Sequence, residues 1–145
     1  MTMRRLIACV SIVFGLLAGS AAPTLAATLI AKVSLSTQTM TVIHRGQEKY
    51  QWKVSTAREG KVTPKGAWTA KRFKRFHRSS RYNNAPMPYS IFYSGNFAVH
   101  GTNQLSRLGS PASAGCIRLS KSNAAKLFSL AKRAGLRNTQ VVVVE

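Results

Sequence analysis

Two side chains of this 145-residue sequence could together perform covalent chemistry: the thiol of Cys116 and the imidazole of His100. A cysteine attacks a carbonyl as its thiolate, so it needs a neighbouring base or positive charge that lowers its pKa from about 8.5, and histidine is the base suited to neutral pH. Gly115 lets the backbone turn tightly, so that N–H groups near the thiol can point at a developing oxyanion. Arg118 is placed to bind a substrate carboxylate. These residue types suit acyl transfer through a thioester.

The N-terminus has the pattern of a secretion signal. Arg4 and Arg5 form a short positive region, residues 6–17 are an apolar run, and small residues lead to a plausible cleavage point after Ala26. The apolar run is short for a membrane span, and a retained anchor is the alternative interpretation. We therefore expect a cleaved signal over residues 1–26 and one domain over residues 27–145.

Cleavage at that point would remove Cys9 and leave Cys116 as the lone cysteine. Exported proteins usually pair their cysteines, so a lone one is either buried and inert or kept for its reactivity. By itself Cys116 would be interpreted as a small buried side chain, and His100 as a core histidine. The two together, with Gly115 and export, favour the reactive interpretation. His44 and His77 have no such partner and are predicted to be structural or surface residues.

The charge composition excludes several kinds of site. The sequence holds 22 Lys and Arg, no Asp, and three Glu: Glu48, Glu59 and Glu145. A carboxylate dyad for glycoside hydrolysis, a Ca²⁺ or Mg²⁺ site and a Ser-His-Asp triad all need more acidic groups than this. No Cys or His pair has metal-ligand spacing, so we expect no metal and no cofactor.

A formal net charge of +19 suits a polyanionic partner: nucleic acid, anionic lipid or an acidic cell-envelope polymer. Residues 71–81 (KRFKRFHRSSR) concentrate this charge around Phe73 and Phe76. They are interpreted either as a segment that tracks an anionic polymer or as a solvated edge strand whose cations discourage aggregation. Export argues against nucleic acid, and we expect no stable membrane insertion.

The hydropathy pattern predicts a mainly β domain with one helix after Cys116. Alternating apolar residues predict a meander of antiparallel hairpins. Ser120 or Ser122 is expected to cap the helix and Gly135 to end it. The predicted strands are 28–35, 40–44, 50–55, 67–73, 89–93, 96–100 and 140–145.

The residues around Cys116 resemble the L,D-transpeptidase catalytic domain family, also called YkuD-like. His100-Gly101 and the later run Ser113-Ala114-Gly115-Cys116-Ile117-Arg118 carry the resemblance, with support from Ser55-Thr56, residues 63–66 and Met87-Pro88-Tyr89. The resemblance covers nearly all of residues 27–145. It implies an antiparallel β-sandwich or barrel with one packed α-helix.

The resemblance also implies roles for individual residues. Cys116 would be the nucleophile, His100 the base, and the carbonyl of Gly101 would orient the imidazole. The N–H groups from Ala114 to Cys116, Gly115 included, would stabilise the oxyanion. Tyr89, Ser113 and Arg118 would contact the substrate. Two features depart from the family pattern: Ala114 stands where a second His is usual, and the loop of residues 101–112 is short.

The substrate implied is a peptidoglycan stem peptide. Cys116 would attack the carbonyl at the L-centre of its diamino acid, and the terminal D-amino acid would leave. The acceptor would be the amine of a second stem, a D-amino acid, a protein amine or water. No wall-sorting signal or repeat module appears, which favours the periplasm of a Gram-negative bacterium. Alternatives are a non-catalytic module that binds peptidoglycan or another envelope polyanion, and a membrane-surface or nucleic-acid binder.

Overall fold

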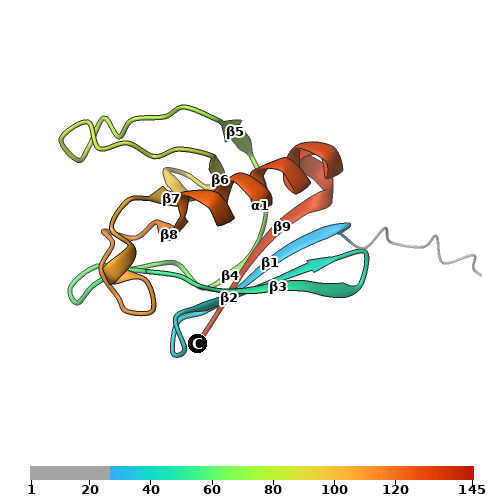
Figure 1. Ribbon diagram of the computed structural model, residues 1–145, viewed down its shortest axis with the longest axis horizontal. Coiled ribbons are helices and arrows are strands. Elements are labelled where there is room, and N and C mark those ends of the chain that lie inside the picture. The colour runs from blue at the N-terminus through green and yellow to red at the C-terminus, as the bar shows by residue number, and fades with distance from the viewer. Residues whose placement is uncertain (1–26) are drawn as a thin grey trace, which may run out of the picture.

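The computed structural model describes residues 27–145, so the predicted signal over residues 1–26 lies outside the described residues. Two sheets and one α-helix make up this part of the chain (Figure 1). The elements are β1 (Leu29–Ser34), β2 (Thr39–His44), β3 (Gln47–Lys53), β4 (Gly66–Thr69), β5 (Arg72–Lys74), β6 (Ser90–Ser94), β7 (Phe97–Thr102), β8 (Ile117–Ser120), α1 (Lys121–Ala134) and β9 (Thr139–Val144). Among these residues, no helix has the length and apolar character that a membrane crossing requires.

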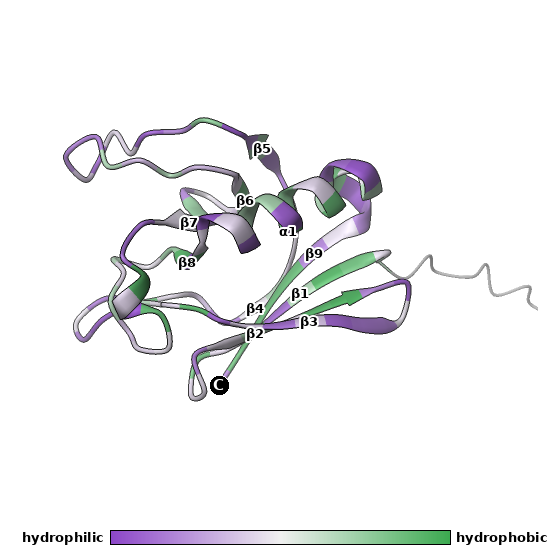
Figure 2. Ribbon diagram, viewed as in Figure 1, coloured by the Kyte–Doolittle hydropathy of each residue, from purple (hydrophilic) through white to green (hydrophobic). Residues whose placement is uncertain are grey.

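The strands form one sheet in the order β3-β2-β1-β9-β4 and a second in the order β5-β6-β7-β8. A continuous core unites the two sheets with the helix, because inward side chains such as Val42, Ile91 and Leu127 belong to one buried cluster. Figure 2 shows the same arrangement, with apolar segments on the central strands and hydrophilic ones at β5. The predicted mainly β class with one packed helix is confirmed.

The strand pairing is mixed rather than wholly antiparallel. β1 pairs in parallel with β9, and β7 pairs in parallel with β8. A parallel return needs a crossover of about a dozen residues or more, and the segment 103–116 supplies it between β7 and β8. β8 itself was not among the predicted strands. Its existence decides the site, because it fixes the residues around Cys116 beside β7.

Two other predicted elements differ from the structure. The single strand expected over 67–73 is divided, because β4 joins the first sheet and β5 the second. The strand expected to end at His100 continues to Thr102, so His100 lies inside β7. The helix boundaries agree with prediction: the Ser120 hydroxyl accepts from the amide of Asn123 at 3.2 Å, and Gly135 follows the last turn with φ of 87°.

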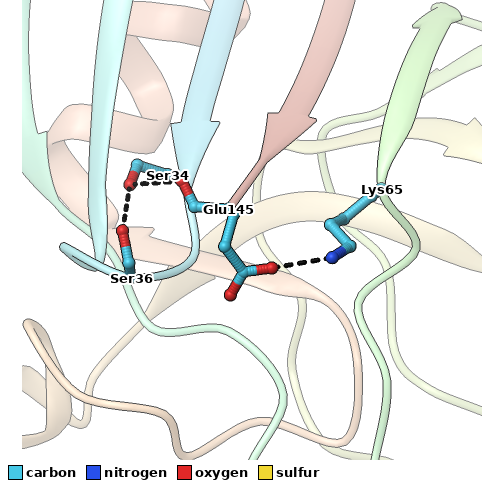
Figure 3. A network of polar contacts seen from close by, with 4 residues as sticks. All are labelled: Ser34, Ser36, Lys65 and Glu145. Atoms are coloured by element: carbon cyan, nitrogen blue, oxygen red, sulfur yellow. Dashed lines mark hydrogen bonds and ion pairs between the residues drawn. The ribbon is translucent and has the colours of Figure 1, made fainter.

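The C-terminal strand is tied at its end by polar contacts (Figure 3). Lys65 Nζ lies 2.7 Å from Glu145 Oε2, and the Ser34 hydroxyl donates to the backbone carbonyl of Glu145 at 3.2 Å. Both partners of the ion pair are largely exposed, so it contributes about 1 kcal/mol or less to folding. It is the one ion pair within residues 27–145.

Candidate active site

The parallel pairing of β7 with β8 brings Cys116 and His100 to the same face of their sheet. Val99 opposes Ile117 and His100 opposes Arg118 across the ladder. Val99 and Ile117 point into the main core, so by strand alternation Ala98 and His100 face the other side. Cys116 packs against the small cluster that contains Ala98. Cys116 therefore lies on the strand next to that of His100, displaced from it by two residues, about 7 Å, along the strand direction.

A cavity of about 1050 Å³ opens on this face, and both residues line it. Its floor is the β7–β8 pair, and residues 101–104 and the start of α1 form one side. The other side is a long hairpin, residues 75–89, which connects β5 to β6 and which we name the arm (Figure 1). Hydrogen bonds from the Met87 amide to the His77 carbonyl (2.8 Å) and from the Tyr89 amide to the Arg75 carbonyl (2.9 Å) hold its two halves together.

The imidazole of His100 is buried, neutral and oriented. Its side chain is 6% exposed, and Nδ1 lies 2.8 Å from the carbonyl oxygen of Gly101. A carbonyl only accepts, so Nδ1 carries the proton and Nε2 presents a lone pair. Burial lowers the His100 pKa to about 4, and the nearby Arg118 and His77 act in the same direction against the Gly101 hydrogen bond. At neutral pH the ring can therefore accept a proton at Nε2.

The contact between the Gly101 carbonyl and His100 requires a glycine at position 101, because neighbouring atoms leave little room for a side chain. A Cβ at this position would lie 3.1 Å from Lys121 Cα and 3.2 Å from Pro88 Cγ. Its amide donates to the Pro88 carbonyl at 2.8 Å, which holds the backbone of Gly101 next to the carbonyl that accepts from His100. The contact expected between the Gly101 carbonyl and the imidazole is thus present.

The thiol of Cys116 is half-buried and protonated at rest. Burial raises its pKa, and the backbone of Ala98 and the charge of Arg118 reduce that effect without reversing it. Sγ lies 3.8 Å from the carbonyl oxygen of Asn96, at the turn between β6 and β7. The neighbours of the thiol therefore do not bring its pKa below the ordinary value in the resting protein. A base must therefore remove the proton during attack.

The loop before the thiol is held by two hydroxyl groups. The Ser113 hydroxyl donates to the Cys116 carbonyl at 2.6 Å and accepts from the Gly115 amide at 3.0 Å. The Thr63 hydroxyl donates to the Gly115 carbonyl at 2.8 Å and accepts from the Ala57 amide at 3.0 Å. In the sequence, Thr63 belongs to residues 63–66, which support the family resemblance; its buried hydroxyl is a feature that this pattern does not reveal.

These contacts bear on two expected roles. The Gly115 amide is engaged by Ser113, so the candidate oxyanion donors that remain are the amides of Ala114 and Cys116. Ser113 lines the cavity but is almost fully buried and uses its hydroxyl within the loop, and its contact with substrate stays a prediction. Gly115 is required for space: at φ of 136°, a Cβ would fall 2.5 Å from Phe97 Cε1 and 2.8 Å from the Val62 carbonyl.

Arg118 and Tyr89 both line the cavity, as expected of substrate contacts. The Arg118 guanidinium donates to Gln104 Oε1 at 3.1 Å, which directs it along the loop 103–116. Tyr89 occupies a left-handed conformation (φ 57°), and its ring packs edge-on against Phe128 of α1 at 5.7 Å. It therefore forms a wall between this cavity and a smaller hollow beside α1.

His77 is a cavity residue that the sequence did not identify. It belongs to the arm, and its ring meets Phe92 edge-on at 5.1 Å, next to the cluster that Cys116 contacts. Its position depends on how the arm folds back, which no local pattern specifies. His44, on β2, is not among the cavity residues. Within residues 27–145 no three His, Cys, Asp or Glu side chains are grouped to hold a metal ion.

Comparison with known proteins agrees with this architecture. The sequence model of the L,D-transpeptidase catalytic domain matches residues 29–143. Similar solved structures include an L,D-transpeptidase from Stackebrandtia nassauensis (25% identity, 81% of this chain and 56% of that chain, TM-score 0.71). They also include the LD transpeptidase LdtMt1 in complex with imipenem (25% identity, 81% of this chain and 59% of that chain, TM-score 0.71). A third is Mycobacterium tuberculosis L,D-transpeptidase 1 (25% identity, 81% of this chain and 62% of that chain, TM-score 0.64).

The chain spans less than two thirds of the length of these structures. No curated protein gives a significant sequence match.

Proposed function

Because the chain belongs to the L,D-transpeptidase catalytic domain family, we propose that it is a cysteine L,D-transpeptidase acting on peptidoglycan stem peptides through a thioester acyl-enzyme. The observation that carries the proposal is the pairing of β7 with β8, which sets a thiol and a neutral, oriented imidazole on one face of one cavity. Nucleophile and base need this shared accessible face.

Acylation begins with proton transfer. As the donor carbonyl approaches, Nε2 of His100 takes the thiol proton and Sγ attacks the carbonyl carbon at the L-centre of the diamino acid. The amides of Ala114 and Cys116 stabilise the oxyanion. The tetrahedral intermediate collapses as the bond to the terminal D-amino acid breaks, and the His100 imidazolium returns the proton to the leaving amine. The product is a thioester on Cys116 and a free D-amino acid.

Deacylation reverses the roles. An acceptor amine loses its proton to His100 and attacks the thioester, and Cys116 leaves as a thiol after His100 returns the proton. A second stem's amine gives a direct cross-link between diamino acids, a D-amino acid gives exchange, and water gives trimming, which is carboxypeptidase activity. A protein amine would give attachment to the wall. The reaction consumes no oxidant and needs no metal.

We place this activity outside the cytoplasm, in the periplasm of a Gram-negative bacterium. The secretion pattern of residues 1–26 and the domain over 27–145 support this placement, as does the polymer on which the family acts.

A second candidate is a non-catalytic module that binds peptidoglycan or another anionic envelope polymer. The excess of 22 Lys and Arg over three Glu favours it, as does Ala114 at the place of the family's second His. This module would bind purified sacculi in a salt-sensitive way, as the enzyme also would, but it would release no D-amino acid from a stem tetrapeptide.

Incubation with a purified stem tetrapeptide tests the proposal, with products identified by mass. We expect release of the terminal D-amino acid, and cross-linked dimer or trimmed tripeptide according to the acceptor. The Cys116→Ala variant should fold, as judged by circular dichroism, and release nothing. A folded wild-type protein that releases no D-amino acid would refute the enzymatic proposal and leave the binding module.

A further inference from the structure

The active-site cavity is lined by cations that have no acidic partner. Five basic side chains line it, and none of the described residues that line it is Asp or Glu. They are Arg72, Arg78, Arg81, Arg118 and Lys121. The chain's glutamates lie elsewhere, on β3, in the turn at 58–60 and at the C-terminus. The single ion pair within residues 27–145, Lys65 with Glu145, is also outside the cavity (Figure 3).

The start of α1 adds to this positive field. Lys121 is the first residue of the helix, and the first turn contains no acidic residue. The helix N-terminus carries partial positive charge, so acidic side chains are favoured there and a lysine is not. Lys121 Cα would lie only 3.1 Å from a Cβ on Gly101, which places this helix end directly beside His100. The arrangement is unfavourable for the protein alone and favourable when an anion is bound.

Two cations of the opposite wall are held in place, Arg78 by the fold of the arm and Arg72 of β5 by an aromatic ring. The amide of Ser79 donates to the Ala85 carbonyl at 2.9 Å near the tip. The Arg78 guanidinium donates to the Asn84 carbonyl at 3.1 Å, and Arg72 lies 4.2 Å above the ring of Phe92. The guanidinium groups of Arg78 and Arg72 are therefore held at the cavity.

Both imidazoles of the cavity respond to the same field. Burial first, then Arg72 and Lys74, lowers the pKa of His77. Arg118 and His77 add to the effect of burial on the His100 pKa. Both shifts favour the neutral rings, so the positive charge of the cavity comes from its arginine and lysine side chains.

We propose that this cavity selects stem peptides whose side carboxylates are free over peptides in which the same groups are carboxamides. The inference rests on the proposed function and names the form of its substrate. A carboxylate accepts charge-assisted hydrogen bonds from guanidinium and ammonium groups, roughly twice as strong as neutral ones. A carboxamide has only one neutral acceptor oxygen. Its NH₂ group is a donor and cannot accept a hydrogen bond from a guanidinium or ammonium group. Because the cations line the same cavity as Cys116, a bound acyl donor meets them.

Two synthetic tetrapeptides test this selection: one with free carboxylates on its second and third residues, the other with both as carboxamides. We expect kcat/KM to be about tenfold higher for the carboxylate peptide, the equivalent of one charge-assisted contact. The ratio of the two kcat/KM values should be smaller at high ionic strength. It should also be smaller in the Arg78→Gln and Arg81→Gln variants. The Lys49→Gln variant, which removes an exposed cation on β3 outside the cavity, should keep the full ratio.

Calorimetry on the Cys116→Ala protein should show the same order of affinities without turnover. Equal kcat/KM values and equal affinities for the two peptides would overturn the inference while leaving the transpeptidase proposal intact. A ratio that survives undiminished in a folded Arg78→Gln, Arg81→Gln double variant would overturn the role of the arm. Turnover of neither peptide would refute the proposed function, and this inference with it.

Discussion

His100 has two properties that suit a general base for a thiol: a fixed tautomer and an imidazole that is neutral, and so able to accept a proton, at neutral pH. The Gly101 carbonyl supplies the first and burial the second. In a chain without Asp, a backbone carbonyl performs the orienting role that a carboxylate performs in many triads. A carbonyl does not stabilise an imidazolium as strongly as a carboxylate does, which is consistent with the lowered pKa.

The lowered His100 pKa predicts an unusually acid-tolerant enzyme. Acylation needs neutral His100, so kcat/KM should rise with pH around 4 and already be near its plateau at pH 5.5. An ordinary histidine, with a pKa near 6.5, would leave only about a tenth of the plateau at that pH. The measurement is the rate of Cys116 acylation against pH. A midpoint near 6.5 would contradict the account.

The same shift predicts a loss of stability in acid. The folded pKa of about 4 lies below the unfolded value of 6.5, so the unfolded chain binds the proton first. The His100 contribution is complete above pH 6.5 and is lost as pH falls toward 4, by about 3 kcal/mol in all. Urea unfolding at pH 7 and pH 4.5 measures it. His100→Gln should show a markedly smaller difference between the two pH values.

Gly115 predicts a stability effect that comes from space as well as backbone conformation. Gly115→Ala should lower the free energy of unfolding by about 3 kcal/mol, since its Cβ would overlap Phe97 and the Val62 carbonyl. The matched control is Gly46→Ala, whose φ of 77° is also left-handed but whose Cβ would meet nothing within 4 Å. It should cost about 1 kcal/mol. If urea unfolding gave the two variants the same loss of unfolding free energy, the neighbours of Gly115 would have moved to make room for the added Cβ.

At the scale of elements, the crossover from β7 to β8 is what makes the site. The crossover and β8 are both held to the segment 55–63: the backbone of Ser55 bonds in both directions with Arg118 of β8, and the Thr63 hydroxyl donates to the carbonyl of Gly115. The donors proposed for the oxyanion therefore depend on a residue some fifty positions earlier in the chain.

Thr63→Val tests this dependence. The substitution keeps the shape but removes the hydroxyl, leaving the Gly115 carbonyl and the Ala57 amide without their buried partner, at a cost of about 2 kcal/mol in unfolding free energy. We expect kcat to fall about tenfold with little change in KM, because the oxyanion donors move while the substrate walls do not. Thr41→Val, on β2 and outside the cavity lining, should change neither. A change in KM alone would contradict a positioning role.

The sequence predicted those elements whose signal is local. The strand alternation of residues 28–44 and the capped helix at 121–134 needed only their own residues to be recognised. β8 was missed because its four residues lie between a turn and a helix cap, and only pairing with β7 makes them a strand. The split of 67–73 was missed for a similar reason, since the choice between two sheets is made by distant partners.

The residues of the site divide in the same way, into those with a local signal in the sequence and those placed by distant partners. Cys116, His100 and the Gly101 contact follow from residue type and family resemblance, whereas Thr63 and His77 reach the site through long-range packing. The engagement of the Gly115 amide could not be predicted either, because it depends on the rotamer of Ser113.

For the whole molecule, the dominant quantity is a formal net charge of +19. We expect such a charge to draw the protein to an anionic polymer, which would concentrate a peptidoglycan enzyme near its substrate. We expect binding to purified sacculi to weaken as salt rises from about 50 to about 500 mM, since surface charges are screened beyond a Debye length of a few ångströms at the upper value. Sedimentation with sacculi measures it, and Cys116→Ala should behave as wild type. Binding that does not weaken with salt would show that apolar or covalent contacts, rather than charge, hold the protein on the sacculi.

The central claim is that Cys116, activated by His100, is acylated. One similar structure holds imipenem, so we expect a carbapenem to acylate this chain too. Intact-mass analysis after exposure to imipenem should show one adduct, mapped by fragmentation to Cys116. The adduct should be absent in Cys116→Ala and form at least about a hundredfold more slowly in His100→Gln, the usual effect of losing a general base. A folded wild-type protein without an adduct, or an adduct that persists in Cys116→Ala, would contradict the account.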